Sequence, residues 1–180
     1  ITGIAGSKLN IGTNALSVYT DDAAVSSINV PIANYRNNAT NTMSNVLTKF
    51  GPGTLEMGAL GTFQGGIVVN QGVLSLTAAN VIPTFENLNA VTGSIVTIRP
   101  GASVLLNNNN QEFGNLAAVN QGAEFQFSGG VLNLGTATLT VGREGSNQTF
   151  SGQLIGGAGS KLVKIGGGTL TINNYNAAMA

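Results

Sequence analysis

Cysteine and histidine are both absent from this sequence of 180 residues. Zinc sites and nucleophile–histidine pairs are built from those residue types, so neither can be assembled here from its usual parts. Histidine is also the commonest general base in enzymes. The sequence therefore predicts a protein that is not an enzyme, with no catalytic residues, no cofactor and no metal site.

Charge is scarce, and long apolar runs are missing. Only 8% of the residues are charged and the net charge is zero, whereas a soluble globular protein has about 25% charged residues. The seven Lys and Arg residues are scattered, which argues against a nucleic-acid partner. No run of about 18 apolar residues occurs, so we expect no membrane span. Because the chain begins at Ile1 without a signal-like segment, we expect a processed or trimmed chain.

Glycine and asparagine take the place of charge, and they punctuate short apolar strands. The unit 47–57 aligns without a gap with residues 162–172, and residues 9–18 align in the same way with residues 132–141. Within each strand apolar and polar residues alternate, which is typical of a strand with one buried face. The strand–corner–strand units cover residues 9–18, 47–57, 67–76, 95–106, 116–127, 132–141 and 162–172.

Near-identical strands that recur about one coil apart favour a parallel solenoid over an antiparallel sandwich. From Gly53 to Gly168 the glycine corners advance by 115 residues in five steps, a mean of 23 residues per step. We therefore predict an all-β fold, a parallel β-helix (β-solenoid) of about seven coils. A single domain over residues 1–180 is expected.

One stretch resembles a known family. Residues 47–76 resemble the autotransporter-associated β-strand repeat of bacterial passenger domains, through Leu-Thr-Lys49, the corner Gly51-Pro-Gly53 and the later Val69-Asn70 and Gly72. A second copy covers 150–152 and 162–175. The resemblance implies a right-handed β-helix that is exported to the bacterial cell surface. It also implies that the protein acts as an adhesin, scaffold or stalk.

Residues 19–45 interrupt the repeat, and we predict an irregular insert there. Residues 23–28 are expected to form one short helix after an Asp cap. The insert is either the place of a specific contact or a loop that covers one end of the solenoid. The run 107–110 is read either as an amide-rich turn between coils or as a solvated loop.

The acidic residues do not form a recognisable catalytic pair. Asp21 and Asp22 are neighbours, so on an extended chain their side chains point to opposite faces. We expect them to be surface or capping residues. The five glutamates fall in different units and are predicted to lie on the surface: Glu56, Glu86, Glu112, Glu124 and Glu144. The phenylalanines are predicted to be mostly core rather than a binding stripe: Phe50, Phe63, Phe85, Phe113, Phe125, Phe127 and Phe150.

Three local motifs are interpreted as chance matches. Residues 156–161 start like a calcium-binding repeat but have Lys161 where that repeat needs Asp, and they lack the residue order of a P-loop. Residues 38–40 and 147–149 fit the glycosylation pattern, which an Asn-rich chain meets often.

Two functions of different class follow from these patterns. Neither end has an obvious charged cap, so open coils favour head-to-tail stacking of copies into an extracellular filament. Residues 174–180 are expected to reach the next subunit. The alternative is an adhesin-type passenger fragment that binds a host or matrix ligand. Self-association is the partner interaction that we expect, with no nucleic acid and no membrane span.

Overall fold

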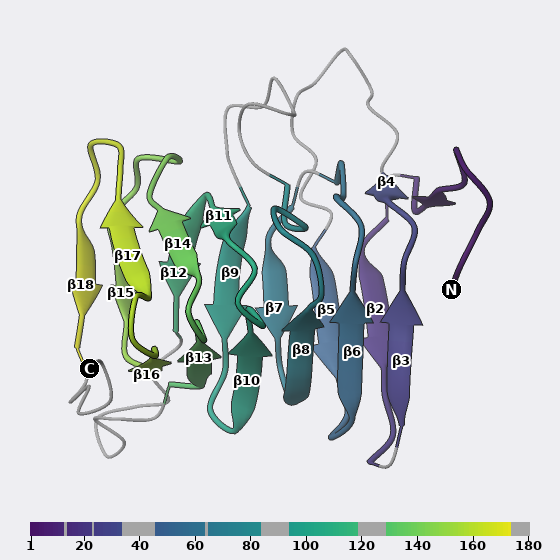
Figure 1. Ribbon diagram of the computed structural model, residues 1–180, viewed down its shortest axis with the longest axis horizontal. Helices are drawn as coiled ribbons and strands as arrows, with labels where there is room; N and C mark the ends of the chain where they lie inside the picture. Colours follow the sequence, from purple (N-terminus) through teal and green to yellow (C-terminus); the bar gives the residue numbers. More distant parts are fainter. Residues whose placement is uncertain are drawn as a thin grey trace.

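The computed structural model describes residues 1–12, 14–22, 24–33, 46–63, 65–83, 94–118 and 129–173 of the chain. In those residues every regular element is a strand, and all the paired strands run parallel. The strands stack side by side along the long axis of the molecule, with β1 to β4 near one end and β17 and β18 at the other (Figure 1). The predicted all-β parallel solenoid is thus confirmed. Among the described residues no helix is long and apolar enough to cross a membrane.

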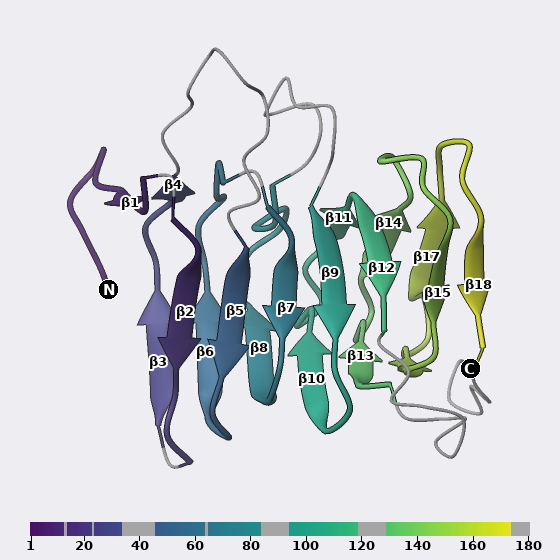
Figure 2. The same ribbon diagram turned by 180° about the vertical axis from the view of Figure 1, so that it is seen from behind.

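Each coil of the chain visits up to three faces, which we number in chain order. Face 1 contains β1 (Leu9–Asn10), β4 (Ile32–Ala33), β11 (Gln111–Phe113), β14 (Thr138–Val141) and β17 (Lys161–Lys164). Face 2, seen in front in Figure 2, contains β2 (Leu16–Tyr19), β5 (Leu47–Phe50), β7 (Ile67–Val69), β9 (Ile95–Ile98), β12 (Asn115–Ala117), β15 (Gln148–Phe150) and β18 (Leu170–Ile172). Face 3 contains β3 (Val25–Ile28), β6 (Thr54–Met57), β8 (Gly72–Leu76), β10 (Ala102–Leu105), β13 (Val131–Asn133) and β16 (Gln153–Ile155).

Backbone hydrogen bonds join the strand pairs into these faces. On face 2, the Ala118 amide donates to the Thr149 carbonyl at 3.2 Å, so β15 and β18 continue the five-stranded sheet. On face 1, the Thr62 amide donates to the Ile32 carbonyl at 2.8 Å and the Asn80 amide to the Asn110 carbonyl at 3.0 Å. Those hydrogen bonds keep face 1 continuous in the coils that have no regular strand on that face.

Identical kinds of side chain lie above one another in the core. The register stacks five aliphatic side chains on face 3, each no more than 2% exposed: Leu55, Leu74, Val104, Leu132 and Leu154. Burying one such side chain stabilises the fold by about 1.5–3 kcal/mol. The alternation read from the sequence therefore places one residue in two inside, as expected for a half-buried strand.

The length of a coil is less regular than the sequence spacing suggested. Thr54 pairs with Val73, 19 positions further on, whereas Leu16 pairs with Leu47, 31 positions further on. The two gapless repeats also do not occupy the same face. The first copy turns from β5 on face 2 to β6 on face 3, and the second turns from β17 on face 1 to β18 on face 2. In Figure 1 these two corners lie at opposite ends of the strands.

The predicted irregular insert at residues 19–45 is wrong for its described part. Tyr19 ends β2, and residues 25–28 form β3 instead of a helix, in register with β6. Val25 and Ile28 are β-branched and favour a strand, and the Ala24 amide bonds the Asp21 carbonyl in a turn at 3.0 Å. β4 then pairs with β1. Residues 34–45 lie outside the described residues.

Candidate functional site: inward lysines at the coil corners

Lys49 is a charged residue inside the solenoid. It lies on β5 in the position that Val18, Val69 and Ile98 occupy in neighbouring coils of face 2. Its side chain is 0% exposed. The sequence pattern assigned Lys49 no site role beyond its place in the repeat, because a lysine in an alternating strand is normally expected on the solvent-exposed side.

The corner that follows β5 satisfies the ammonium group. Lys49 Nζ donates to the carbonyl oxygens of Phe50 at 2.9 Å, Gly51 at 2.7 Å and Gln71 at 3.1 Å. An ammonium has three N–H donors, so these three acceptors use all of them. Two acceptors come from its own corner, whereas Gln71 belongs to the next coil. Lys49 therefore joins two coils through their corner backbone.

Burial lowers the pKa of Lys49 below its usual 10.5, because desolvation disfavours the charged form. A buried unpaired cation costs free energy, and hydrogen bonds to carbonyl oxygens offset part of that cost. The Gly51 carbonyl is the buried acceptor of the three, whereas the Phe50 carbonyl also accepts the Thr20 amide at 3.1 Å, so the corner depends on Lys49 mainly at Gly51 and at the contact with the next coil.

Lys164 holds the same position in the second copy. It lies on β17 in register with the buried Val141, and its Nζ donates to the carbonyls of Ile165 at 2.6 Å and Gly166 at 3.1 Å. These two acceptors correspond to Phe50 and Gly51 of the first copy. Lys164 is nevertheless exposed. Among the described residues, the second copy thus repeats the lysine site without an acceptor from a following coil.

Asparagines fasten another corner to the coils on both sides. Asn107 Nδ2 donates to Ser75 Oγ at 2.8 Å and Asn109 Nδ2 to the Leu76 carbonyl at 3.1 Å, in the preceding coil. Asn108 Oδ1 accepts from the Thr136 amide at 2.9 Å, in the following coil. The interpretation of residues 107–110 as an amide-rich turn is confirmed, and three of the four residues, Asn107, Asn108 and Asn110, are also exposed to solvent.

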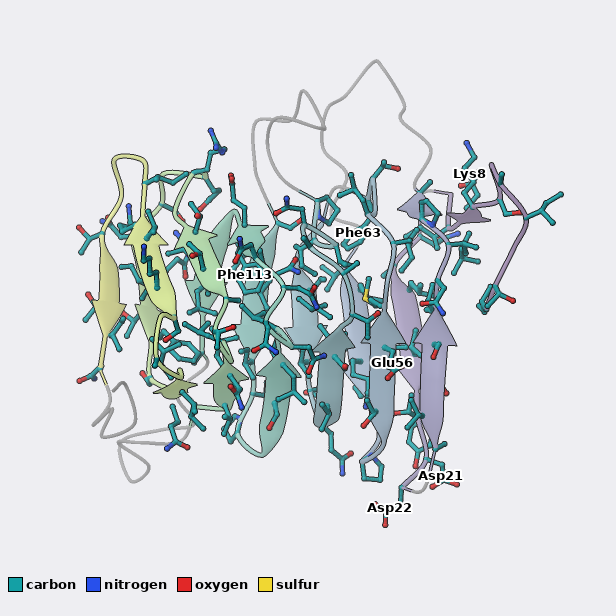
Figure 3. The ribbon with its side chains drawn as sticks, viewed as in Figure 1. Lys8, Asp21, Asp22, Glu56, Phe63 and Phe113 are labelled. Carbon is teal, nitrogen blue, oxygen red and sulfur yellow. The ribbon has the colours of Figure 1, made fainter. Side chains whose placement is uncertain are left out.

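The acidic residues lie apart and have structural partners. Asp21 and Asp22 are exposed at the corner between β2 and β3, whereas Glu56 lies along β6 (Figure 3). Glu56 accepts a hydrogen bond from Ser27 Oγ at 2.9 Å. Glu112 forms an ion pair with Arg143. In the part of the chain that the structure describes, no group of three His, Cys, Asp or Glu residues could hold a metal ion.

The remaining sequence candidates sort into core and surface. Phe63, Phe113 and Phe150 are 0% exposed, as expected, and Figure 3 shows the first two inside the coil. Phe50 is 38% exposed and is the exception among the described phenylalanines; the residue points outward because Lys49 beside it points inward. Six further candidates lie outside the described residues: Asn38, Phe85, Glu86, Glu124, Phe125 and Phe127.

The chance motifs have ordinary structural roles where they are described. In residues 156–161 the Gly157 amide donates to the Gly135 carbonyl at 2.7 Å, which makes this segment a corner between β16 and β17. Asn147 Oδ1 accepts from the Thr169 amide at 2.8 Å, so its amide group ties two coils together.

Comparison with known proteins identifies the repeat. No curated protein matches the chain. The family model named passenger-associated-transport-repeat matches residues 47–76 and 162–178. Each match begins at or beside the strand that holds the inward lysine, and each contains its glycine corner. The chain therefore carries the passenger-associated-transport-repeat of autotransporter passenger proteins at two places, which confirms the resemblance seen in its sequence.

Proposed function

We propose that this protein is a non-enzymatic, extracellular structural protein of the bacterial cell surface or matrix. In this proposal it is a right-handed β-solenoid of about seven coils, and its copies stack head-to-tail into a filament. The passenger-associated-transport-repeat supports export to the surface. We also propose that the protein has no catalytic site. This is supported by the structural partners of two glutamates, since Glu56 accepts a hydrogen bond from Ser27 and Glu112 forms an ion pair with Arg143.

The stacking proposal is supported mainly by the positions of the exposed apolar side chains. Large apolar residues are exposed mainly in the first and last described coils: Ile1, Ile4, Tyr19, Val25, Val163 and Ile172, against Phe50 and Leu60 elsewhere. Those end coils also hold strand edges that pair on one side only among the described residues, namely β1 and β2 at the first coil and β16, β17 and β18 at the last. An unpaired parallel edge with apolar neighbours is a template for another strand.

Head-to-tail contacts of this kind are heterologous and build open filaments unless a rotation closes them. We expect purified protein to form rods that lengthen with concentration in electron microscopy and light scattering. Dispersed monomers across the whole concentration range would contradict the stacking proposal.

An adhesin-type passenger is the second candidate, and an outward aromatic pair favours it. Tyr19 and Phe50 are in register on face 2 and are 70% and 38% exposed. Adjacent exposed aromatic rings are common in binding surfaces. This candidate predicts that the monomer binds an extracellular-matrix protein or glycan and that Tyr19→Ser abolishes binding. A Tyr19→Ser variant that binds as well as the wild type would remove the support that this pair gives.

A further inference from the structure

Lys164 and Lys49 have similar surroundings, but one hydrogen-bond acceptor of Lys49 has no counterpart at Lys164 among the described residues. Both lysines point inward, both donate to two carbonyls of their own corner, and both precede a glycine corner. Lys49 has a third acceptor, the Gln71 carbonyl of the following coil. Its burial is complete, whereas Lys164 is exposed. The first copy therefore shows what kind of group fits over the second.

The group that covers Lys49 is an Asn-x-Gly corner. Asn70-Gln71-Gly72 lies over it, with Gly72 at a φ of 70°. The Asn70 amide also donates to the Lys49 carbonyl at 2.9 Å. The ligand for an uncovered lysine of this type is thus a backbone carbonyl in the middle of such a corner.

The first coil of the chain offers a corner of the same Asn-x-Gly pattern on the matching face, and its Ile11 carbonyl, which accepts the Asn14 amide at 3.2 Å, keeps a second lone pair for another donor. Asn10-Ile11-Gly12 follows β1, with Gly12 at a φ of 61°. β1 and β17 both belong to face 1, and both lead into face 2. If a second copy continues the stack without rotation, its β1 lies on β17 and its β2 lies on β18.

The two ends also match in their inward apolar side chains. Apart from Ala78 and Ala118, the partly buried apolar residues packed against the core all lie in the two end coils: Leu9, Ile11, Leu16, Val18, Leu162 and Leu170. At the first coil, Ile1 already occupies β3, because the Asn29 amide donates to the Ile1 carbonyl at 2.9 Å. Among the described residues, the edges of the first coil that remain for stacking are therefore β1 and β2.

We infer that the exposed end formed by β17 and β18 docks the first coil of a second copy of this chain, and that Lys164 Nζ binds the Ile11 carbonyl of that copy. Leu9 of the second copy then lies over Lys164 as Val69 lies over Lys49. The inference rests on the proposed stacking and adds to it one specific contact between subunits, that of Lys164 with the Ile11 carbonyl, which we call the joint. A joint that needs an inward lysine and an Asn-x-Gly corner also fixes the rotation of one subunit on the next.

The test compares Lys164→Met with Lys161→Met. Both residues lie on β17 and are exposed, but Lys161 donates to no corner carbonyl in the structure. Analytical ultracentrifugation of the full chain should show self-association weakened by about tenfold in Lys164→Met, since a charged hydrogen bond is lost, and little changed in Lys161→Met. In the wild type, the Lys164 amine should resist acetylation once copies assemble, while the Lys161 amine stays reactive.

The outcomes separate the joint from the stacking. A wild type that never associates overturns both. A wild type that associates while Lys164 stays as reactive as Lys161, with Lys164→Met assembling normally, overturns the joint and leaves the stacking proposal standing. Equal weakening by both substitutions would assign the effect to charge in general and would also overturn the joint. Mass spectrometry of the acetylated wild type gives this answer without any variant that could fail to fold.

Discussion

Lys49 and Lys164 occupy equivalent positions in two copies of one repeat, yet one is fully buried and the other is exposed. Their own corners are alike, since each lysine donates to the carbonyls of the next two residues. The difference comes from the following coil, which supplies the Gln71 carbonyl to Lys49 alone. A solenoid residue is therefore completed by its neighbour along the stack, and its energetic role depends on whether that neighbour is present.

The contact with the preceding coil, by contrast, is the same in the two copies of the repeat. A methyl group on Gly53 would overlap the carbonyl oxygen of Asp21, and one on Gly168 would overlap that of Ser146. Both glycines allow the corner backbone to press against the coil before it. The two copies thus share one contact and differ in the other, which separates the two directions of stacking experimentally.

The largest expected effect is that of Lys49→Met. The substitution keeps the aliphatic stem but removes the ammonium donor from three corner carbonyls, of which, among the described residues, only that of Phe50 keeps another donor, the Thr20 amide, so the free energy of unfolding should fall by about 3 kcal/mol. Lys164→Met should change it in the monomer by less than about 0.5 kcal/mol, as an exposed residue does. Urea unfolding of both variants checks the comparison. Equal losses in the two variants would mean that the following coil adds nothing.

Gly53→Ala and Gly168→Ala should both be destabilising, by about 2 kcal/mol or more, because the added Cβ meets backbone that cannot move aside easily. Gly167→Ala is the matched control, since no atom lies within 4 Å of its Cβ position. Urea unfolding, with hydrogen exchange of residues 161–172, gives the measurement. If Gly168→Ala behaved like Gly167→Ala, the last corner would not be pressed against the preceding coil.

A smaller effect is expected in the pH dependence of stability, which should distinguish wild type from Lys49→Met. Because burial lowers the folded-state pKa of Lys49, the unfolded chain binds more protons than the folded chain between that lowered pKa and 10.5. This contribution to the free energy of unfolding therefore rises as pH increases towards 10.5. Unfolding of wild type and Lys49→Met at a series of pH values measures it, since the other groups cancel. A gap that narrows with rising pH would contradict the sign.

The smallest effect is expected at the ion pair between Glu112 and Arg143, whose side chains are 20% and 32% exposed. Arg143 Nη2 donates to Glu112 Oε2 at 3.2 Å, so the pair links two coils at the surface as Lys49 does inside. Glu112→Gln should cost about 0.5–1 kcal/mol at low salt and less at high salt. Thermal unfolding at two salt concentrations tests this. If Glu112→Gln lowered the free energy of unfolding as much as Lys49→Met, burial would not explain the difference between these two contacts between coils.

Most of the coil architecture could be predicted from local patterns. Alternation within strands such as Thr169–Ile172 and glycine corners such as Gly51–Gly53 identified the strand units and the parallel stack. The insert at residues 19–45 was missed in its described part because β3 and β4 lack the glycine corner of the repeat. Val25 and Ile28 carry a strand preference, but the pairing with β6 that decides the outcome involves residues 29 positions away.

The sequence of a repeat also does not predict the face of the solenoid on which that repeat lies. The first copy of the passenger repeat turns between faces 2 and 3 and the second between faces 1 and 2, although the sequences align without a gap. Residues 9–18 and 132–141 differ by the same step, from faces 1 and 2 to faces 3 and 1. Coils between 19 and 31 residues long shift one copy against the other. Local sequence encodes strand, corner and strand; the sum of the coil lengths sets the face.

By itself the sequence determined the strand units, their glycine corners, the scarcity of charge and the passenger repeat, because each of these depends on residues close together in the chain. Only the tertiary structure decided that Lys49 points inward, that Asn107 and Asn108 bind opposite neighbours, and that Lys164 stands exposed at an end. Each of those facts depends on which coil lies next in the stack. That neighbour is about 20 to 30 residues away in sequence but one strand spacing, ~4.8 Å, away in space.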